Sequence, residues 1–288
     1  DNFYFISSNN AAWSMSKGGT GYVNYGDPGD KRWDKNKQRD AYNVLVQGIV
    51  ENKLTSKGDI QFKYKNAGVF AAAGTDIDGR DVYQNVQFPF VKDANGYYEF
   101  NSSKNHVYVD KSKKNGQTLT LEAGKQTVGS VSSFFPCKAD GNYSPDYHFG
   151  MNMSIPFYIN ENGKDENNNP IKFEFSGDDD VWVFVDGKLV LDIGGIHNAI
   201  KGDINFNTGV ATVYKGQTNT GVKTTNIYTS NVLGTNWKNE TNKVHTLQVF
   251  YLERGEGESN CKIKFNLEIK DQLQVTKSLG NKAEDDKD

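Results

Sequence analysis

Hydrophobic and polar residues alternate with a period of two along most of the chain, which is the pattern of half-buried β-strands. Turn-forming Gly, Asn, Asp and Pro residues separate the alternating segments, and the helical period of 3.6 is rare. The predicted strands are residues 68–72, 97–100, 106–110, 118–122, 148–159, 171–175, 181–185, 188–193, 210–213, 244–253 and 261–270. Because these segments are short and closely spaced, the pattern predicts an all-β protein built as a sandwich.

The strongest local signal is a hairpin around Asp186 and Gly187. A two-residue Asp-Gly loop between apolar runs is typical of a type I′ turn, because both turn residues must adopt positive φ. In the strand before the turn, valines alternate with Trp182 and Phe184, so both faces of the strand are apolar. We therefore predict a central strand that is covered on both sides, with Trp182 in the core.

Residues 37–53 are the one helix candidate, because their apolar residues fall near helical spacing. Their β-branched content leaves a strand open as the alternative. The prediction therefore allows one short helix in the N-terminal part of the chain.

The composition changes after Asp271, where one short alternating run is followed by charged residues up to the end of the chain. We expect one domain over residues 1–270 and a linker to a further domain over residues 271–288. A disordered tail is the alternative for the second segment.

Charge and composition narrow the class of partner. The formal net charge is −3, and the 33 basic and 36 acidic side chains are spread along the chain without a basic stripe, so nucleic acid is not an expected partner. No stretch approaches the roughly 20 apolar residues of a membrane helix, and no leader is visible at the start, so membrane insertion is not expected. A surface rich in Asn, Thr, Ser, Gly and Tyr favours an extracellular protein.

Cys137 and Cys261 are the two cysteines of the chain. They exclude a cysteine-based zinc site but permit one disulfide, which is worth about 4–5 kcal/mol in the chain-entropy model. The extracellular composition favours the bridge, and two buried free thiols are the alternative.

Three adjacent carboxylates, those of Asp178, Asp179 and Asp180, directly precede the most apolar strand. Two unit charges about 4 Å apart repel by about 1 kcal/mol in water and by several times that near a protein surface. A cation is therefore expected beside them. Calcium fits best, because it accepts about six to eight oxygen ligands in irregular geometry, and we predict all three acids as metal ligands.

A second loop, "ERGEGESN" over residues 253–260, is expected to complete the site. Glu256 is the predicted metal ligand from this loop, and Glu258 and Asn260 are predicted ligand-binding residues. Arg254 is a further candidate, which can instead pair with the acids as a salt bridge. His197 follows two glycines that permit an unusual backbone path, and we predict that it returns to the site as a ligand-binding residue.

The segments "FEFSGDDDVWVFVDGKLVLDIGGIH", "GDINFNTG" and "LQVFYLERGEGESNCKIKF" resemble the fibro-slime domain, a branch of the PA-14 family. The resemblance covers residues 148–270, and the upstream segments look like the matching parts of surface and pilus-tip adhesins of Gram-positive bacteria. It implies a PA-14-like antiparallel β-sandwich with N-terminal elaborations. It also implies that Asp178 and Asp179 hold a calcium ion that binds sugar hydroxyls directly. Gly255 departs from this pattern, because many fibro-slime sequences have a histidine there.

The tail "LQVTKSLGNKAEDDKD" looks like the opening strand of an Ig-like pilin module, so the resemblance implies that pilin-like domains follow in the full protein. The expected function is a calcium-dependent, carbohydrate-binding adhesin domain at the tip of a bacterial surface protein or pilus. Its expected partner is a glycan on a host or neighbouring cell, and its expected location is the cell surface.

Two other functions remain open on the sequence. The first is a structural or protein-binding tip domain in which calcium only rigidifies loops. The second is a glycoside hydrolase, which we do not expect, because adjacent aspartates on one strand do not supply two carboxyl groups about 5–10 Å apart on facing elements. The sequence therefore predicts a protein that is not an enzyme.

Overall fold

The computed structural model describes residues 2–7, 33–34, 39–40, 45, 47–63, 81–128, 131–136, 149–195, 197–215, 220–228, 232–237, 240–253 and 259–269. Within these residues the chain consists of strands, turns and one short 3₁₀ helix at Glu161–Gly163. The all-β prediction is therefore confirmed. No helix in this part of the chain has the length and apolar character needed to cross a bilayer.

Six strands form the first sheet, in the order β14-β13-β18-β11-β1-β4, and every neighbouring pair is antiparallel. Its strands are β1 (Asn2–Ser7), β4 (Asp81–Val86), β11 (Phe149–Phe157), β13 (Asp180–Val185), β14 (Lys188–Ile193) and β18 (His245–Glu253).

Seven strands form the second sheet, in the order β17-β16-β15-β12-β19-β6-β5, again with antiparallel neighbours. Its strands are β5 (Val91–Lys92), β6 (Tyr98–Asn101), β12 (Lys172–Gly177), β15 (Ile200–Asn205), β16 (Val210–Lys215), β17 (Thr220–Asn226) and β19 (Cys261–Phe265). The remaining strands form three small pairs, which are β2 (Trp33–Asp34) with β3 (Arg39–Asp40), β7 (Asn105–His106) with β8 (Glu122–Ala123), and β9 (Gln126–Val128) with β10 (Val131–Ser133).

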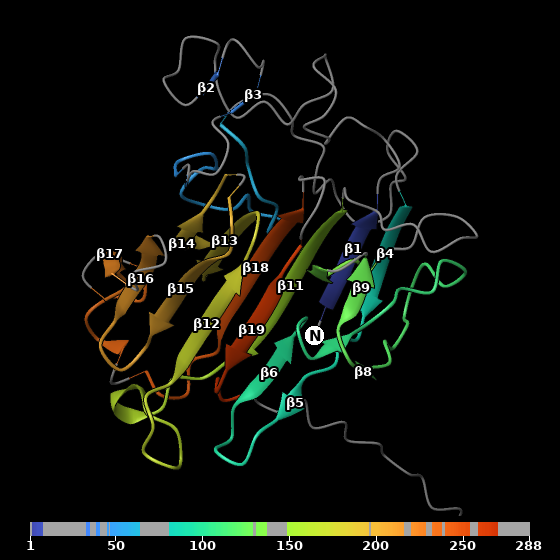
Figure 1. Ribbon diagram of the computed structural model, residues 1–288. Coiled ribbons are helices and arrows are strands. Elements are labelled where there is room, and N and C mark those ends of the chain that lie inside the picture. Colours follow the sequence, from blue (N-terminus) through green and yellow to red (C-terminus); the bar gives the residue numbers. More distant parts are fainter. Residues whose placement is uncertain are drawn as a thin grey trace, which may run out of the picture.

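The two large sheets stack face to face, as Figure 1 shows. Every second side chain of the central strands points into the layer between them, and Phe173, Val183, Ile204 and Ile263 are fully buried there. Burial of each such side chain contributes about 1.5–3 kcal/mol, so the alternating pattern of the sequence is the main source of the sandwich's stability.

Strand β13 is buried on both faces, as predicted. Its second apolar face carries Trp182 and Phe184, which form a separate buried cluster with Phe250 and Leu252 of β18. The Trp182 ring meets that of Phe62 edge to face, with 5.5 Å between centroids. The predicted core position of Trp182 is therefore confirmed, but the residues that cover it come from the N-terminal part of the chain.

Residues 47–63 provide this cover, and the prediction of a helix over residues 37–53 is wrong for the described part of that segment. Residues 47–53 contain no helix and form isolated bridges instead, pairing Val50 with Phe62 and Lys53 with Lys188. The backbone N–H of Leu54 donates to Gly187 O, 2.9 Å away. β-branched residues pack well in such an extended cover. A helix would instead have presented only one stripe of apolar side chains to the sheet.

The hairpin between β13 and β14 has the predicted turn. Asp186 and Gly187 have φ values of 50° and 72°, so both adopt the positive φ that a type I′ turn requires. The Asp186 carboxylate accepts the backbone N–H of Thr246 at 3.0 Å and lies 2.8 Å from Nδ1 of His245. This turn is therefore tied to the start of β18.

Several strand boundaries differ from the pattern. The pattern does not predict β1 to β5, β9, β10, β15 or β17, and it misses β15 because Gly202 and Asp203 weaken the alternation there. Residues 107–121 bury Val107 and Val109 without forming a long strand. The predicted strand 68–72 and the segment 271–288 lie outside the described residues, so the expected linker and pilin strand stay predictions.

The cover over β13 can be tested with Ile49, which is fully buried. Replacement of Ile49 by Ala should lower the free energy of unfolding by about 2–5 kcal/mol, because it leaves a cavity against the Trp182 cluster. Urea denaturation measures this change. Val91→Ala is the control, because Val91 is 48% exposed and its truncation should change stability by less than about 0.5 kcal/mol. Equal effects of the two substitutions would contradict a packed cover.

Candidate functional site

The acidic triplet lies where the chain passes from the second sheet to the first. Strand β12 ends at Gly177 and β13 begins at Asp180, so Asp178 and Asp179 form the whole connection. Asp178, Asp179 and Asp180 are 6%, 4% and 0% exposed. Three neighbouring acids are therefore held inside the protein, where an ionised carboxyl group is costly.

A second connection between the sheets lies beside the first. Strand β18 pairs with β13 and ends at Glu253, and β19 pairs with β12 and begins at Cys261. The register therefore brings Glu253, Ser259 and Asn260 to the triplet, and Glu253 and Ser259 are fully buried. We call Asp178, Asp179, Asp180 and Glu253 the acidic cluster.

Asp178 binds Asn260 through both carboxylate oxygens. Oδ1 accepts the backbone N–H of Asn260, and Oδ2 accepts its side-chain Nδ2 at 3.0 Å. Gly177 permits this approach, because a Cβ at that position would lie 2.1 Å from Asn260 O. Only glycine fits there, so the sequence "SGD" is required by the closeness of the two connections.

Tyr251 lies beneath the cluster and offers one hydroxyl hydrogen to several acceptors. Its hydroxyl oxygen is 2.8 Å from Asp178 O, 3.1 Å from Glu253 Oε2 and 2.9 Å from Ser259 Oγ. Burial raises the pKa of Tyr251 well above its ordinary value, and the charge of Glu253 raises it further. The hydroxyl therefore stays protonated and can donate to either Asp178 O or Glu253 Oε2, whereas in the contact with Ser259 the serine hydroxyl can be the donor.

Burial and the neighbouring charges raise the pKa values of Asp178 and Glu253. Burial raises the pKa of Glu253 well above its ordinary value, and the charges of Asp179 and Asp178 add to the shift. A hydrogen bond between the Asp179 and Glu253 side chains acts in the same direction. Burial also raises the pKa of Asp178 to about 6, although the hydrogen bond from the Asn260 backbone opposes this shift. The cluster is therefore poised to take up a proton or a cation.

Asp192 is a further buried acid at this end of the sheet, and the sequence analysis missed it. Its Oδ2 accepts the backbone N–H of Gly48 at 2.7 Å, which attaches the cover to β14. Burial raises the pKa of Asp192 to about 6, and the charge of Asp180 adds to the shift. The signal was present in "LVLDIGG", where one acid interrupts an apolar strand.

His197 is 4% exposed and near enough to the cluster to feel its charge. Its Nδ1 lies 3.0 Å from the Asn198 carbonyl oxygen and donates to it. Burial lowers the pKa of His197, although the charge of Asp180 opposes this shift. The neutral ring therefore carries its free electron pair on Nε2, an atom with no hydrogen-bond partner among the described residues.

The structure thus brings together Asp178, Asp179 and Asn260 from the predicted site, and adds Glu253. Asp180 points its Oδ1 to the backbone N–H of Gly195 instead. Arg254, Glu256 and Glu258 lie outside the described residues, so their predicted roles stay predictions.

The donor set consists of oxygen atoms, which suits a hard divalent cation. In the described part of the chain, however, no three His, Cys, Asp or Glu side chains are already grouped to hold a metal ion. A complete shell would need backbone carbonyls, amide oxygens or ligands from the connection between β18 and β19.

Cys261 is buried and has a free thiol in this structure, whereas Cys137 lies outside the described residues. Burial raises the pKa of the Cys261 thiol well above its ordinary value, and the charge of Asp178 adds to the shift. The bridge between the two cysteines therefore stays a prediction.

The chain is similar to psi proteins of Dictyostelium discoideum. It is 32% identical to protein psiP over 285 residues, which cover 78% of this chain and 33% of psiP. It is 28% identical to protein psiO over 216 residues, or 72% of this chain and 24% of psiO. Protein psiF is 32% identical over 170 residues, or 52% of this chain and 21% of psiF. The chain therefore spans a third or less of the length of these relatives. No family model matches the chain, and no solved structure matches it.

These relatives overturn the expected identity. The resemblance to the fibro-slime and PA-14 adhesins of Gram-positive bacteria is wrong as an assignment, because the relatives are proteins of a eukaryote. The function that rested on it, a calcium-dependent carbohydrate-binding adhesin at a bacterial surface or pilus tip, is withdrawn with it. Short motifs such as the acidic triplet before an apolar hairpin misled the assignment, because β-sandwiches of different origin can share them.

The buried acids predict an unusual dependence of stability on pH. A carboxyl group whose pKa is higher in the folded state than in the unfolded state binds more protons when folded, so stability falls as pH rises between the two values. For Asp178 these values are 3.8 and about 6. In EDTA, the free energy of unfolding should therefore fall between pH 4 and pH 7.

Asp178→Asn should remove up to about 3 kcal/mol of that fall, since two pKa units correspond to about 2.7 kcal/mol. Urea denaturation at both pH values measures the difference. Asp110→Asn is the control, because Asp110 is exposed and hydrogen bonds from Ser112 lower its pKa, which places its titration below pH 4. An unchanged pH dependence in Asp178→Asn would contradict the raised pKa.

Proposed function

We propose that this chain is an extracellular, non-enzymatic binding module in which the acidic cluster holds a calcium ion between the two connections that join the sheets. One observation carries the proposal, namely that the carboxyl groups of Asp178, Asp179 and Glu253 are buried together, where burial and their mutual charge raise the pKa values of Asp178 and Glu253. Protonation or a bound cation relieves such mutual repulsion, and at neutral pH a cation does so more completely.

The type of donor atom favours calcium among the common cations. The candidate ligands are carboxylate oxygens of Asp178, Asp179 and Glu253, with the backbone carbonyl oxygen of Asn260 nearby. Magnesium requires a near-ideal octahedron of short bonds, and zinc prefers nitrogen or sulfur ligands. His197 lies near the cluster, but a single imidazole does not make a zinc site.

The position of the site suggests what the ion does. Asp178 and Asp179 link β12 to β13, and Glu253 and Asn260 are the described ends of the link between β18 and β19. If carboxylates of both links bound the same ion, that ion would fix the two sheets relative to each other at this end. Calcium would then stabilise the folded module by mass action.

Burial argues against a catalytic role for these acids. A general acid or base must reach the group that it protonates or deprotonates. The acids of the cluster are at most 6% exposed, so a substrate has no access to them in this structure. The extracellular location rests on the composition of the chain, which is rich in Asn, Thr, Ser, Gly and Tyr.

Thermal unfolding with and without calcium tests the proposal. After treatment with EDTA, added CaCl₂ should raise the melting temperature, because a ligand at a hundred times its dissociation constant stabilises the folded state by about 2.7 kcal/mol. Asp179→Asn should abolish this calcium-dependent rise. Asp192→Asn is the matched control, since it removes a neighbouring buried acid outside the proposed ligand set and should keep the rise.

Arg254 provides the competing explanation. If a salt bridge from Arg254 neutralises the cluster, calcium should leave the melting temperature of the natural protein unchanged, and Arg254→Gln should lower it. That pair of results would overturn the proposal. Retention of the full calcium response in Asp179→Asn would also overturn it.

A further inference from the structure

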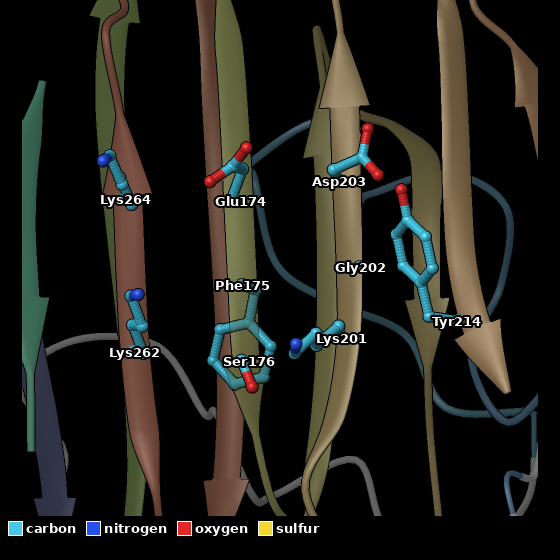
Figure 2. A pocket seen from close by; sticks show the side chains of 9 residues that line it. All are labelled: Glu174, Phe175, Ser176, Lys201, Gly202, Asp203, Tyr214, Lys262 and Lys264. Atoms are coloured by element: carbon cyan, nitrogen blue, oxygen red, sulfur yellow. The ribbon is translucent and has the colours of Figure 1, made fainter. Parts of the chain in front are cut away.

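The outward face of the second sheet carries a polar hollow of about 370 Å³ that lies apart from the acidic cluster. Figure 2 shows its lining side chains on four adjacent strands, β19, β12, β15 and β16. The residues that line it are Glu174, Phe175, Ser176, Lys201, Gly202, Asp203, Tyr214, Lys262 and Lys264. Its volume falls in the range of small-ligand sites, about 300–1,000 Å³.

The sheet register arranges these side chains in two rows across the strands. In the first row Ser176 lies between Lys201 and Lys262. In the second row Glu174 lies between Asp203 and Lys264. Figure 2 shows the two rows at different heights along the strands. One end of the hollow is therefore basic around a hydroxyl group, and the other end has two acids side by side with Lys264 next to them.

The charges are only partly paired across the strands, because Glu174 faces Lys264 on one side and a second acid, Asp203, on the other. Nζ of Lys262 lies 3.4 Å from Glu99, and Nζ of Lys264 lies 3.4 Å from Asp93, so these two lysines of the hollow have acidic partners that do not line it. Within the described part of the chain, Glu174, Asp203 and Lys201 form no ion pair. Like charges directly opposite each other destabilise a sheet, so Glu174 and Asp203 repel each other, although Lys264 faces Glu174 on its other side.

The two carboxylate oxygens of Asp203 have different surroundings. Figure 2 shows the Tyr214 hydroxyl pointing to the Asp203 carboxylate, and this hydrogen bond raises the pKa of Tyr214 to about 12. The other oxygen, Oδ1, is shielded from solvent and has no hydrogen-bond partner among the described residues.

We propose that this hollow binds a small zwitterion of dipeptide size, with its ammonium group at Glu174 and Asp203 and its carboxylate at Lys201, Lys262 and Ser176. The charge of each end selects the opposite group of the ligand. The proposal is independent of calcium, because none of the lining residues belongs to the acidic cluster.

The distance between the rows sets the size of the ligand. Glu174 and Ser176 are two residues apart on β12, which corresponds to about 7 Å along a strand. The ammonium and carboxylate of a free α-amino acid are only about 2.5 Å apart, because one Cα separates them. A second residue adds about 3.8 Å and brings the separation close to that of the rows.

Glycylglycine is the probe for a test by two-dimensional ¹H–¹⁵N NMR of the whole chain. Millimolar glycylglycine should shift the amide signals of residues 174–176 and 201–203. Lys201→Met and Glu174→Gln should each weaken binding at least tenfold. Lys172→Met is the matched control, because Lys172 lies on the same strand outside the hollow and should leave the affinity unchanged.

Peptides with one blocked end test the ammonium contact and the carboxylate contact separately. N-acetylglycylglycine lacks the ammonium group and glycylglycine amide lacks the carboxylate, and each should bind at least tenfold more weakly than glycylglycine. Equal binding of the blocked peptides would overturn the proposal, as would the absence of shifts at these amides. Thermal unfolding of each variant, measured in parallel, shows that a loss of binding is not a loss of folding.

Discussion

The enclosure of four carboxyl groups where the chain crosses between its sheets is the constraint on which the rest of this end of the molecule depends. Asp178 and Asp179 are the whole connection between β12 and β13, so the acids cannot move outwards without separating two central strands. Asn260 can approach only because residue 177 is a glycine without a side chain. The Tyr251 hydroxyl lies within hydrogen-bond distance of both Asp178 O and Glu253 Oε2. Each of these features follows from keeping charge inside a β-sandwich.

The same region connects three separate parts of the chain. The acidic cluster joins the links β12–β13 and β18–β19, and Asp192 accepts a hydrogen bond from Gly48 in the cover over β13. The protonation states of these acids affect one another, because Asp180 raises the pKa of Asp192 and Asp179 raises that of Glu253. A change of charge at one acid therefore changes the pKa values of other acids, which are attached to both sheets and to the cover.

The two charged regions have opposite character. The cluster is closed and acidic, so it suits a bare cation, whereas the hollow on the outer sheet face is open and carries both signs, so it suits a small polar molecule. The similarity to psi proteins covers a third or less of each of those chains. The chemistry of both sites therefore has to be argued from their own residues.

The sequence by itself determined the all-β class, the turn at Asp186 and Gly187, the double burial of β13 and the strain of three adjacent acids, because alternation, turn preference and charge repulsion act between near neighbours. The helix candidate over residues 37–53 is wrong for the described residues 47–53, and the family that the sequence suggested is also wrong. Only the tertiary structure decided that Glu253 and Asn260 meet the triplet, that Asp192 joins this end, and that residues 47–63 cover Trp182. Those contacts depend on strand order and register between distant segments, which periodicity along the chain does not encode.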